Sequence, residues 1–308
     1  MISQSPQLNS DKNDTALRGP RSIREELKRV CSKSAVRTYS LLRELSYRAL
    51  QPFDYTWLSV NGKNDLPPLH LRCRVGPLRN FETAAAEFMV YLKFICKLDP
   101  GERVLDIGCG CGALALPLLE YLDSKGSYRG LDIDKGAIDW CRRRISARCP
   151  NFTFQHIDVR NEVYNPNGRY ESDNYSLSLE DGMFDVILIK SVFTHLLPLA
   201  LDNYLSEVAR LLAPSGRCLA TFFLLSDRTE ELARQKRAKL YFDFGEGSYR
   251  YTCETTPESA VAYRESQVLQ LLQNHRLTLR EPIHYGSWSG FECGLSYQDI
   301  MVITKAKS

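Results

Sequence analysis

Three closely spaced glycines, which follow a short apolar run, are the clearest candidates for chemistry in this chain. The stretch Val104-Leu-Asp-Ile-Gly-Cys-Gly-Cys-Gly112 predicts a strand that ends at Gly108 and a helix that begins just after Gly112. Glycine tolerates a positive φ and lets a ligand approach the backbone without a Cβ in the way. The helix behind the glycines presents free N–H groups at its N-terminus. A nucleotide-type ligand is therefore the natural interpretation.

Acidic residues at predicted strand ends indicate which nucleotide. Asp106 precedes the first glycine by two residues, where a carboxylate can accept a hydrogen bond from an ammonium but would lie poorly beside a pyrophosphate. Asp132 ends the next strand and is placed to accept from two ribose hydroxyls. Asp158 ends the third strand and can accept from an exocyclic amine, with the backbone of Val159 beside an adenine. One ammonium, one ribose and one adenine, without phosphate, describe S-adenosylmethionine (SAM).

Each predicted cofactor residue also has a structural interpretation that needs no ligand. The glycines can form a tight turn without a ligand, Asp106 can cap a loop, and Lys190 can be solvated instead of facing the methionine end of the cofactor. The thiols of Cys109 and Cys111 are expected to fill the loop, since no further metal ligands lie nearby, and no metal is predicted. Asp134 is expected to be the N-cap of the following helix. The predicted cofactor-binding residues are Asp106, Gly108, Cys109, Gly110, Gly112, Asp132, Ile133, Asp158, Val159 and Lys190.

Alternating strands and helices must position these residues. The pattern predicts an α/β fold with a doubly wound, Rossmann-like parallel sheet. The predicted strands are Arg103–Ile107, Tyr128–Asp132, Phe152–Ile157, Phe184–Ile189, Cys218–Leu225, Leu279–Tyr285 and Tyr297–Thr304. The predicted helices are Phe81–Cys96, Ala113–Leu122, Lys135–Ala147, Leu201–Leu212 and a helix that begins at Pro257 and runs to about His275.

The composition limits the remaining possibilities. The chain has 308 residues, 44% hydrophobic and 25% charged, and no apolar run reaches the roughly 18 residues of a membrane helix. Ten scattered cysteines and a polar opening without a secretory signal predict reduced thiols and a cytoplasmic protein. A net charge of +3 is too small to indicate nucleic acid. Stable membrane insertion is not expected.

The predicted domain organisation has three parts. Residues 1–20 form a polar tail without fixed structure. Residues 21–80 form an extension, helical over 22–50 and irregular over 51–80. Within it, residues 21–50 hold eight Arg or Lys against three Glu, which predicts a solvated helix face or a contact with an acidic partner or membrane. Residues 81–308 form the α/β domain, with lid insertions at 160–183 and 226–256.

The motifs VLDIGCGCG, GLDID, HIDV, FDVILIKSVFTHL and LLAPSGRCLATFFLL occur here in the order found in class I SAM-dependent methyltransferases, which the chain resembles over about residues 81–225. YNPNG, SVFTHLLP, CLATFFLL, GSWSG and YQDI resemble a small-molecule, UbiE-like subgroup. The resemblance implies a seven-stranded sheet whose last strand is antiparallel. It also implies SAM across the C-terminal ends of the first strands.

The methyl acceptor is the least determined part. A small-molecule or glycan-like acceptor, methylated at oxygen, is expected, with His195 as the base or a substrate contact. Tyr285, Trp288 and Tyr249 are predicted substrate contacts within an aromatic lid, for which packing between lid and core is the alternative. Asp202 and His284 are weaker candidates. A protein or membrane-associated quinone or lipid acceptor, an inactive SAM-binding partner subunit and an NAD-dependent oxidoreductase stay open.

Overall fold

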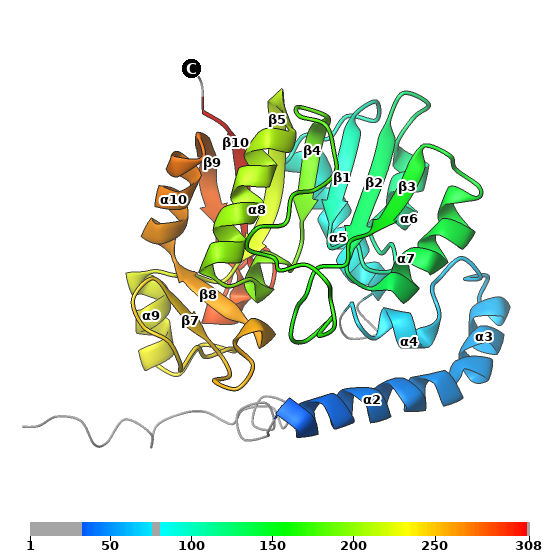
Figure 1. The fold of residues 1–308 in the computed structure, drawn as a ribbon, viewed down its shortest axis with the longest axis horizontal. Helices are drawn as coiled ribbons and strands as arrows, with labels where there is room; N and C mark the ends of the chain where they lie inside the picture. Colours follow the sequence, from blue (N-terminus) through cyan, green and yellow to red (C-terminus); the bar gives the residue numbers. More distant parts are fainter. Residues whose placement is uncertain (1–32, 76–80, 307–308) are drawn as a thin grey trace, which may run out of the picture.

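A seven-stranded sheet forms the centre of the computed structural model, which describes residues 33–75 and 81–306. The predicted tail at 1–20 and the first turns of the predicted N-terminal helix lie outside the described residues. The strand order is β3-β2-β1-β4-β5-β10-β9 (Figure 1). The strand bounds are β1 Arg103–Ile107, β2 Ser127–Asp132, β3 Phe152–His156, β4 Phe184–Ile189, β5 Leu212–Phe222, β9 Leu277–His284 and β10 Asp299–Lys305.

The direction of the strands confirms the predicted architecture. β1 to β5 are parallel, and β10, the last strand, runs antiparallel to both of its neighbours, β5 and β9. Consecutive residues of β1 face opposite sides: Val104 packs into one hydrophobic core and Leu105 into another. Strands that are buried on both faces read as continuous apolar runs, which is why the bounds of β1 and β4 are as predicted.

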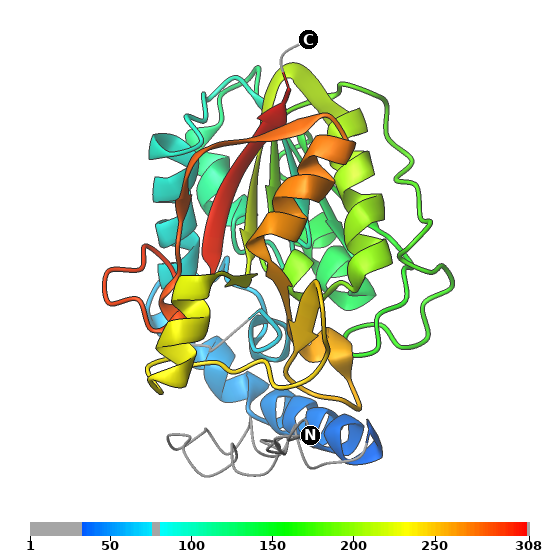
Figure 2. The ribbon, with the colours of Figure 1, turned by 90° about the vertical axis from the view of Figure 1, so that its left-hand side faces the viewer.

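Helices cover both faces of the sheet (Figure 2). The core on one side takes apolar residues from α5 Phe81–Phe94, α6 Ala115–Tyr121 and α7 Lys135–Cys141, which continues as a π-helical turn over Arg142–Ser146. The core on the other side takes them from α8 Pro198–Leu211 and α10 Glu265–Asn274. α6 begins two residues later than predicted, because residues 110–114 form turns that follow the glycine loop.

A small three-stranded sheet, in the order β6-β8-β7, lies beyond the C-terminal end of β5. It consists of β6 Leu224–Leu225, β7 Tyr249–Tyr251 and β8 Val261–Arg264, with α9 Asp227–Arg234 nearby. The helix predicted from Pro257 is wrong at its start. Pro257 opens only a 3-10 turn over Pro257–Ser259, and the next apolar residues pair with β6 as a strand. A short apolar run does not distinguish strand from helix without its partner.

The N-terminal extension is more helical than predicted. α2 spans Lys33–Ala49, α3 Gln51–Val60 and α4 Leu69–Arg72, so the irregular segment predicted for 51–80 is wrong over α3 and α4. The proline at position 52 lies in the first turn of α3, where its missing N–H costs no hydrogen bond. Within the extension, the guanidinium of Arg72 forms a buried ion pair with Asp54.

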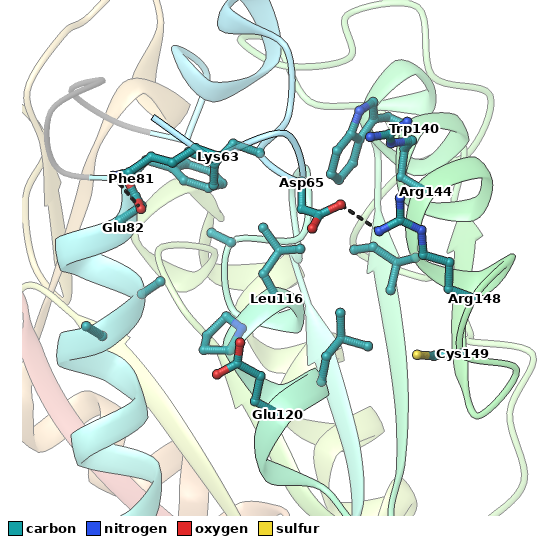
Figure 3. A pocket seen from close by; sticks show the side chains of 18 residues that line it. Lys63, Asp65, Phe81, Glu82, Leu116, Glu120, Trp140, Arg144, Arg148 and Cys149 are labelled. Atoms are coloured by element: carbon teal, nitrogen blue, oxygen red, sulfur yellow. Dashed lines mark hydrogen bonds and ion pairs between the residues drawn. The ribbon is translucent and has the colours of Figure 1, made fainter. Parts of the chain in front are cut away.

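The loop after α3 joins the extension to the α/β core. Lys63 Nζ lies 2.7 Å from the carboxylate of Glu82 on α5, and Asp65 lies 2.6 Å from Arg148 just after the π-helical turn (Figure 3). Beneath the loop, a groove of about 480 Å³ runs over the outer face of α6. None of the predicted cofactor residues lines this groove, although Ala113, directly after the last of the three glycines, does.

Candidate cofactor and acceptor site

The glycine loop between β1 and α6 has the backbone conformation that its sequence predicts. Gly108, Gly110 and Gly112 have φ values of +82°, +54° and +79°. A Cβ on Gly108 would lie 2.3 Å from a methyl carbon of Val192, so only glycine fits there. The N–H of Gly108 donates to the carbonyl of Leu131 over 2.8 Å, which fixes the loop to the end of β2.

Asp132, at the end of β2, contacts this loop directly. One carboxylate oxygen accepts from the Gly110 N–H over 2.6 Å, and the other accepts from the Asp134 N–H over 2.7 Å. Each oxygen therefore retains acceptor capacity for a further hydroxyl. Burial raises the pKa of Asp132 to about 6, although the two N–H donors oppose the shift. Asp134 caps α7 through Gly136 N and Ala137 N, which confirms that prediction.

Asp106 is buried on the side of β1 that faces α5, α6 and α7. Its carboxylate accepts from the hydroxyl of Tyr128 over 2.6 Å, a partner that the sequence analysis did not find. Burial raises the pKa of Asp106 to about 7, while Tyr128 and the positive charge of Lys190 lower it. Lys190 Nζ also lies 4.5 Å from the centre of the Phe88 ring, and burial lowers its pKa. Lys190 is thus the positively charged neighbour of this buried carboxyl.

Asp158 and Val159 follow β3 and are held by the loop after them. The amide of Asn165 donates to the Asp158 carboxylate over 3.2 Å and to the Val159 carbonyl over 3.0 Å. A Cβ on Gly168 would lie 2.4 Å from the backbone nitrogen of Arg160, so the turn closes tightly onto this strand end. The Tyr164-Asn-Pro-Asn-Gly168 motif was the available signal for this loop.

Two predicted cofactor residues have side chains that serve the protein core. Cys109 is buried, and its sulfur packs against Gly130 so closely that a Cβ on Gly130 would lie 2.8 Å from it. Only the backbone of Cys109 is therefore available to a ligand. Burial raises the pKa of its thiol well above the ordinary value. Ile133 packs partly against the other core, and its carbonyl lies 3.2 Å from a ring nitrogen of His156.

His195 lies in a 3-10 turn, Phe193–His195, that follows β4. Its Nδ1 lies 2.8 Å from the backbone carbonyl of Glu258. A carbonyl only accepts, so Nδ1 carries a proton, and Nε2 is the acceptor of the ring in its neutral form. Nε2 lies 3.5 Å from the hydroxyl of Tyr164, whose ring meets the imidazole edge to face. The structure thus gives His195 the tautomer that a general base needs.

The predicted substrate contacts are mostly engaged in packing. Trp288 is 3% exposed, its indole N–H donates to Asp299 over 2.8 Å, and its ring packs on Phe223, while its contact with substrate stays a prediction. Tyr249 is half-buried against the ring of Tyr263. The expected aromatic lid is therefore largely a packed cluster, which was the alternative stated for it.

Tyr285 and the weaker candidates have local partners or lie elsewhere. The Tyr285 hydroxyl donates to Glu265 over 2.7 Å, and its ring stacks on Phe291. Asp202 pairs with His275 over 2.7 Å, joining α8 to the end of α10. His284 is the last residue of β9 and pairs in register with Ile300 of β10.

Several residues at the strand ends were missed by the sequence analysis. Ser191, directly after β4, has a φ of +57°, which is unusual for a residue with a Cβ. Its hydroxyl donates to the Gln298 side chain over 2.9 Å, and its N–H donates to Thr221. Arg74 of the extension forms ion pairs with both Glu44 and Asp134. Single polar residues give no periodic pattern, so only their spatial neighbours reveal them.

Comparisons with known proteins agree with this geometry. Residues 104–216 match the family model described as "Methyltransferase domain". A fatty-acid O-methyltransferase of Mycolicibacterium smegmatis is 29% identical over 61% of this chain and 60% of that protein. Phthiotriol/phenolphthiotriol dimycocerosates methyltransferase 1 of Mycobacterium ulcerans is 35% identical over 39% of this chain and 37% of that protein. This chain therefore covers less than two thirds of the length of either relative.

Among solved structures, the PH0226 protein of Pyrococcus horikoshii overlaps with a TM-score of 0.49 at 21% identity, covering 75% of this chain and 92% of that one. The matched region of this chain is a class I SAM-dependent methyltransferase domain, a transferase whose cofactor is SAM. Within the described residues, no helix is long and apolar enough to cross a membrane.

We predict that SAM affinity rises with pH and levels off above about pH 7 to 8. The pKa values of Asp106 and Asp132 are raised by burial to about 7 and about 6, and the ionised carboxylates are much stronger acceptors for an ammonium and a ribose than the protonated acids are. Raised pKa values mean that the folded, SAM-free protein is partly protonated at these carboxyls near neutral pH, so SAM binding to the ionised forms releases protons. Calorimetry in buffers of different ionisation enthalpy measures this release.

The control for this prediction is Asp106→Asn, which keeps the shape of the side chain but does not titrate. Its weaker SAM binding should lose most of the pH dependence near neutrality. A wild-type affinity that is constant between about pH 5.5 and 8 would contradict the assignment of these carboxyls to the cofactor.

Proposed function

We propose that this protein transfers the methyl group of SAM to a hydroxyl oxygen of a small, lipid-like acceptor. Bound SAM supplies a methyl group on a positively charged sulfur. The chain's own residues then have three tasks: to hold the cofactor, to orient the acceptor oxygen and to receive its proton. In this proposal Asp132 binds the ribose hydroxyls, Asp106 and Lys190 flank the methionine end, and Asp158 with Val159 borders the adenine.

The single observation that carries the proposal is the hydrogen bond between His195 and Glu258. Because Nδ1 donates to the Glu258 carbonyl, Nε2 is the basic nitrogen of the ring, and in this proposal an acceptor hydroxyl takes the place of the Tyr164 hydroxyl beside it and gives Nε2 its proton. A hydroxyl acquires acidity only as the new bond forms, so a base within reach accelerates its methylation. A carboxylate acceptor has no proton to lose and needs no such base, so the fixed imidazole favours a hydroxyl over a carboxylate.

The chemical class of the acceptor has two supports. The relatives include a fatty-acid O-methyltransferase and a methyltransferase for phthiotriol dimycocerosates, both named for apolar acceptors. The glycan-like alternative rested on aromatic faces in the lid, and Trp288, the largest of them, is buried against Phe223 and Phe242. A lipid-like acceptor is therefore preferred to a polyhydroxylated one.

Transfer from methyl-labelled SAM tests the proposal directly. The purified full chain is offered a long-chain hydroxy acid ester, an isoprenoid quinol and an aryl glycoside, and the products are separated and analysed for label. Label in an ether of the hydroxy acid ester or the quinol supports the proposal. Label in the glycoside alone would contradict the acceptor class, and SAM binding without any transfer would favour a SAM-binding partner subunit.

We predict that His195→Gln lowers kcat by about 100-fold and leaves the dissociation constant of SAM unchanged, since removal of a general base typically costs that much. The rise of kcat with pH that reports deprotonation of the imidazole should also disappear. His275→Gln is the matched control, because His275 pairs with Asp202 at the opposite end of the sheet. Full turnover in His195→Gln would remove His195 from the mechanism.

A further inference from the structure

α2 is amphipathic with its apolar face turned away from the protein. Leu41, Leu42 and Leu45 lie on one side of the helix and are each more than half exposed. Glu44 is only 22% exposed and forms ion pairs with Arg48 of the same helix and with Arg74 next to the cofactor loop. A surface helix normally buries its apolar stripe and exposes its charges, so this orientation needs an explanation.

α3 repeats the arrangement. Phe53, Trp57 and Val60 follow one another at helical spacing on one face and are 75%, 53% and 82% exposed. The inner side of the helix is held by Leu58, which is buried, and by Asp54 in its ion pair with Arg72. The six exposed residues of the two helices, Leu41, Leu42, Leu45, Phe53, Trp57 and Val60, are called the apolar patch below.

The charge around the patch favours an anionic occupant. Residues 33–75, which carry the patch, contain seven Arg or Lys and three Asp or Glu, a net charge of +4, whereas the whole chain carries +3. The remainder of the chain therefore carries −1. A second copy seated on the same patch would bring two strongly positive segments together. Exposed Leu, Phe and Trp beside basic residues are typical of helices that lie in the interface of an anionic bilayer.

The patch also lies near the entrance to the site. α2 and α3 are found beyond the C-terminal ends of β1 to β5, the same edge that carries the glycine loop (Figure 1). Arg74 joins Glu44 of α2 to Asp134 just after β2. A Cβ on Gly110 would lie 3.1 Å from a methyl carbon of Val75. The segment that carries the patch is thus in direct contact with the cofactor loop.

We propose that α2 and α3 bind the surface of an anionic lipid bilayer through the apolar patch, without crossing it. Binding places the strand ends against the membrane, from which an apolar acceptor reaches the site without passing through water. The statement about the route of the acceptor rests on the proposed function, whereas the statement about bilayer binding does not. Membrane binding is therefore measured without any acceptor.

Trp57 provides a spectroscopic probe of this binding. Trp140 and Trp288 are buried, so a change in tryptophan emission on addition of vesicles reports Trp57. The full-length protein is mixed with vesicles of phosphatidylglycerol and phosphatidylcholine, or of phosphatidylcholine alone. We expect flotation with the anionic vesicles and a blue shift of the emission, both reduced at high salt because surface charges are then screened. Equal binding to both vesicle types, or to neither, would overturn the proposal.

Matched variants test the patch itself. Phe53→Ser with Val60→Ser should weaken partitioning to anionic vesicles by roughly tenfold or more, since two apolar side chains no longer enter the interface. Phe94→Ser with Leu199→Ser removes two residues of similar exposure, 67% and 71%, from other surfaces, and should bind as the wild type does. Equal loss in both double variants would overturn the assignment to α2 and α3. The assignment would also be overturned if light scattering showed that the wild type is a dimer and that Phe53→Ser with Val60→Ser dissociates it.

SAM binding by the same variants separates the two proposals. Calorimetry should give wild-type SAM affinity for both double variants, because neither pair contacts the glycine loop. A protein that binds vesicles but methylates none of the offered acceptors would contradict the proposed function and leave the membrane surface standing. Methylation of a lipid-like acceptor by a protein that never binds vesicles would support the proposed function and overturn the membrane-binding proposal.

Discussion

Asp132→Ala is expected to weaken SAM binding by about 100-fold, the largest single effect on the cofactor. The carboxylate already accepts one N–H on each oxygen, from Gly110 and from Asp134, which fixes its position between the glycine loop and the end of β2. Its remaining lone pairs are oriented before any ligand arrives. Two charge-assisted hydrogen bonds to ribose hydroxyls are worth about 3 kcal/mol together, which corresponds to about 100-fold in affinity.

The effect has a second origin in the loop itself. Without the carboxylate, the Gly110 N–H loses its acceptor, and the loop is held to β2 by the bonds of Gly108 and Cys109 to the Leu131 carbonyl. Asp132→Asn keeps one acceptor oxygen and should lose less affinity than Asp132→Ala. Asp139→Ala, on the nearby helix α7, removes an exposed ion pair with Lys135 and serves as control. Calorimetric titration with SAM that gives equal affinities for all three variants would contradict the ribose assignment.

Arg217→Leu is expected to lower the free energy of unfolding by about 3 to 5 kcal/mol, the largest effect on stability. Arg217 is buried on β5, and its guanidinium donates to the backbone carbonyls of Cys96 and Lys97 and to the carboxylate of Glu102. Leucine fills part of the volume but donates nothing. Two carbonyls and a carboxylate then lose their partner in a site that water reaches poorly.

Arg103→Leu is the matched control for this prediction. Arg103, at the start of β1, pairs with Asp185 over 2.8 Å, but its side chain is 44% exposed. Exposed ion pairs contribute about 1 kcal/mol or less, because water solvates the separated charges. Urea denaturation of the purified proteins measures both changes. Similar losses for the two variants would show that the burial of Arg217 does not set its contribution.

The predictions from sequence were most accurate where a residue's neighbours along the chain are also its neighbours in space. β1 and β4 were found with their bounds because strands covered on both faces must be apolar throughout. Gly108, Gly110 and Gly112 were found because a positive φ restricts the residue type at each position separately. The cap of α7 by Asp134 was found because its acceptor and donors lie within three residues.

The sequence did not reveal the environment of a residue where the deciding partner is distant in sequence. The segment Val261–Arg264 is a strand because β6, some 40 residues earlier along the chain, offers it a parallel edge. Trp288 is buried because Asp299 accepts its indole N–H and Phe223 packs on its ring. An aromatic residue in a glycine-rich stretch looks the same in sequence whether its ring is packed or exposed.

The sequence by itself determined the doubly wound sheet, the glycine loop and the carboxylates at its strand ends, because periodicity and backbone conformation are local properties. Tertiary structure alone decided which side chains are available to act there. It fixed the tautomer of His195 through the carbonyl of Glu258, 63 residues away, and it turned the leucines of α2 outward by pairing Glu44 with Arg74. Hydrogen bonds and ion pairs between distant residues leave no periodic signal, because each is a single contact made only when the chain is folded.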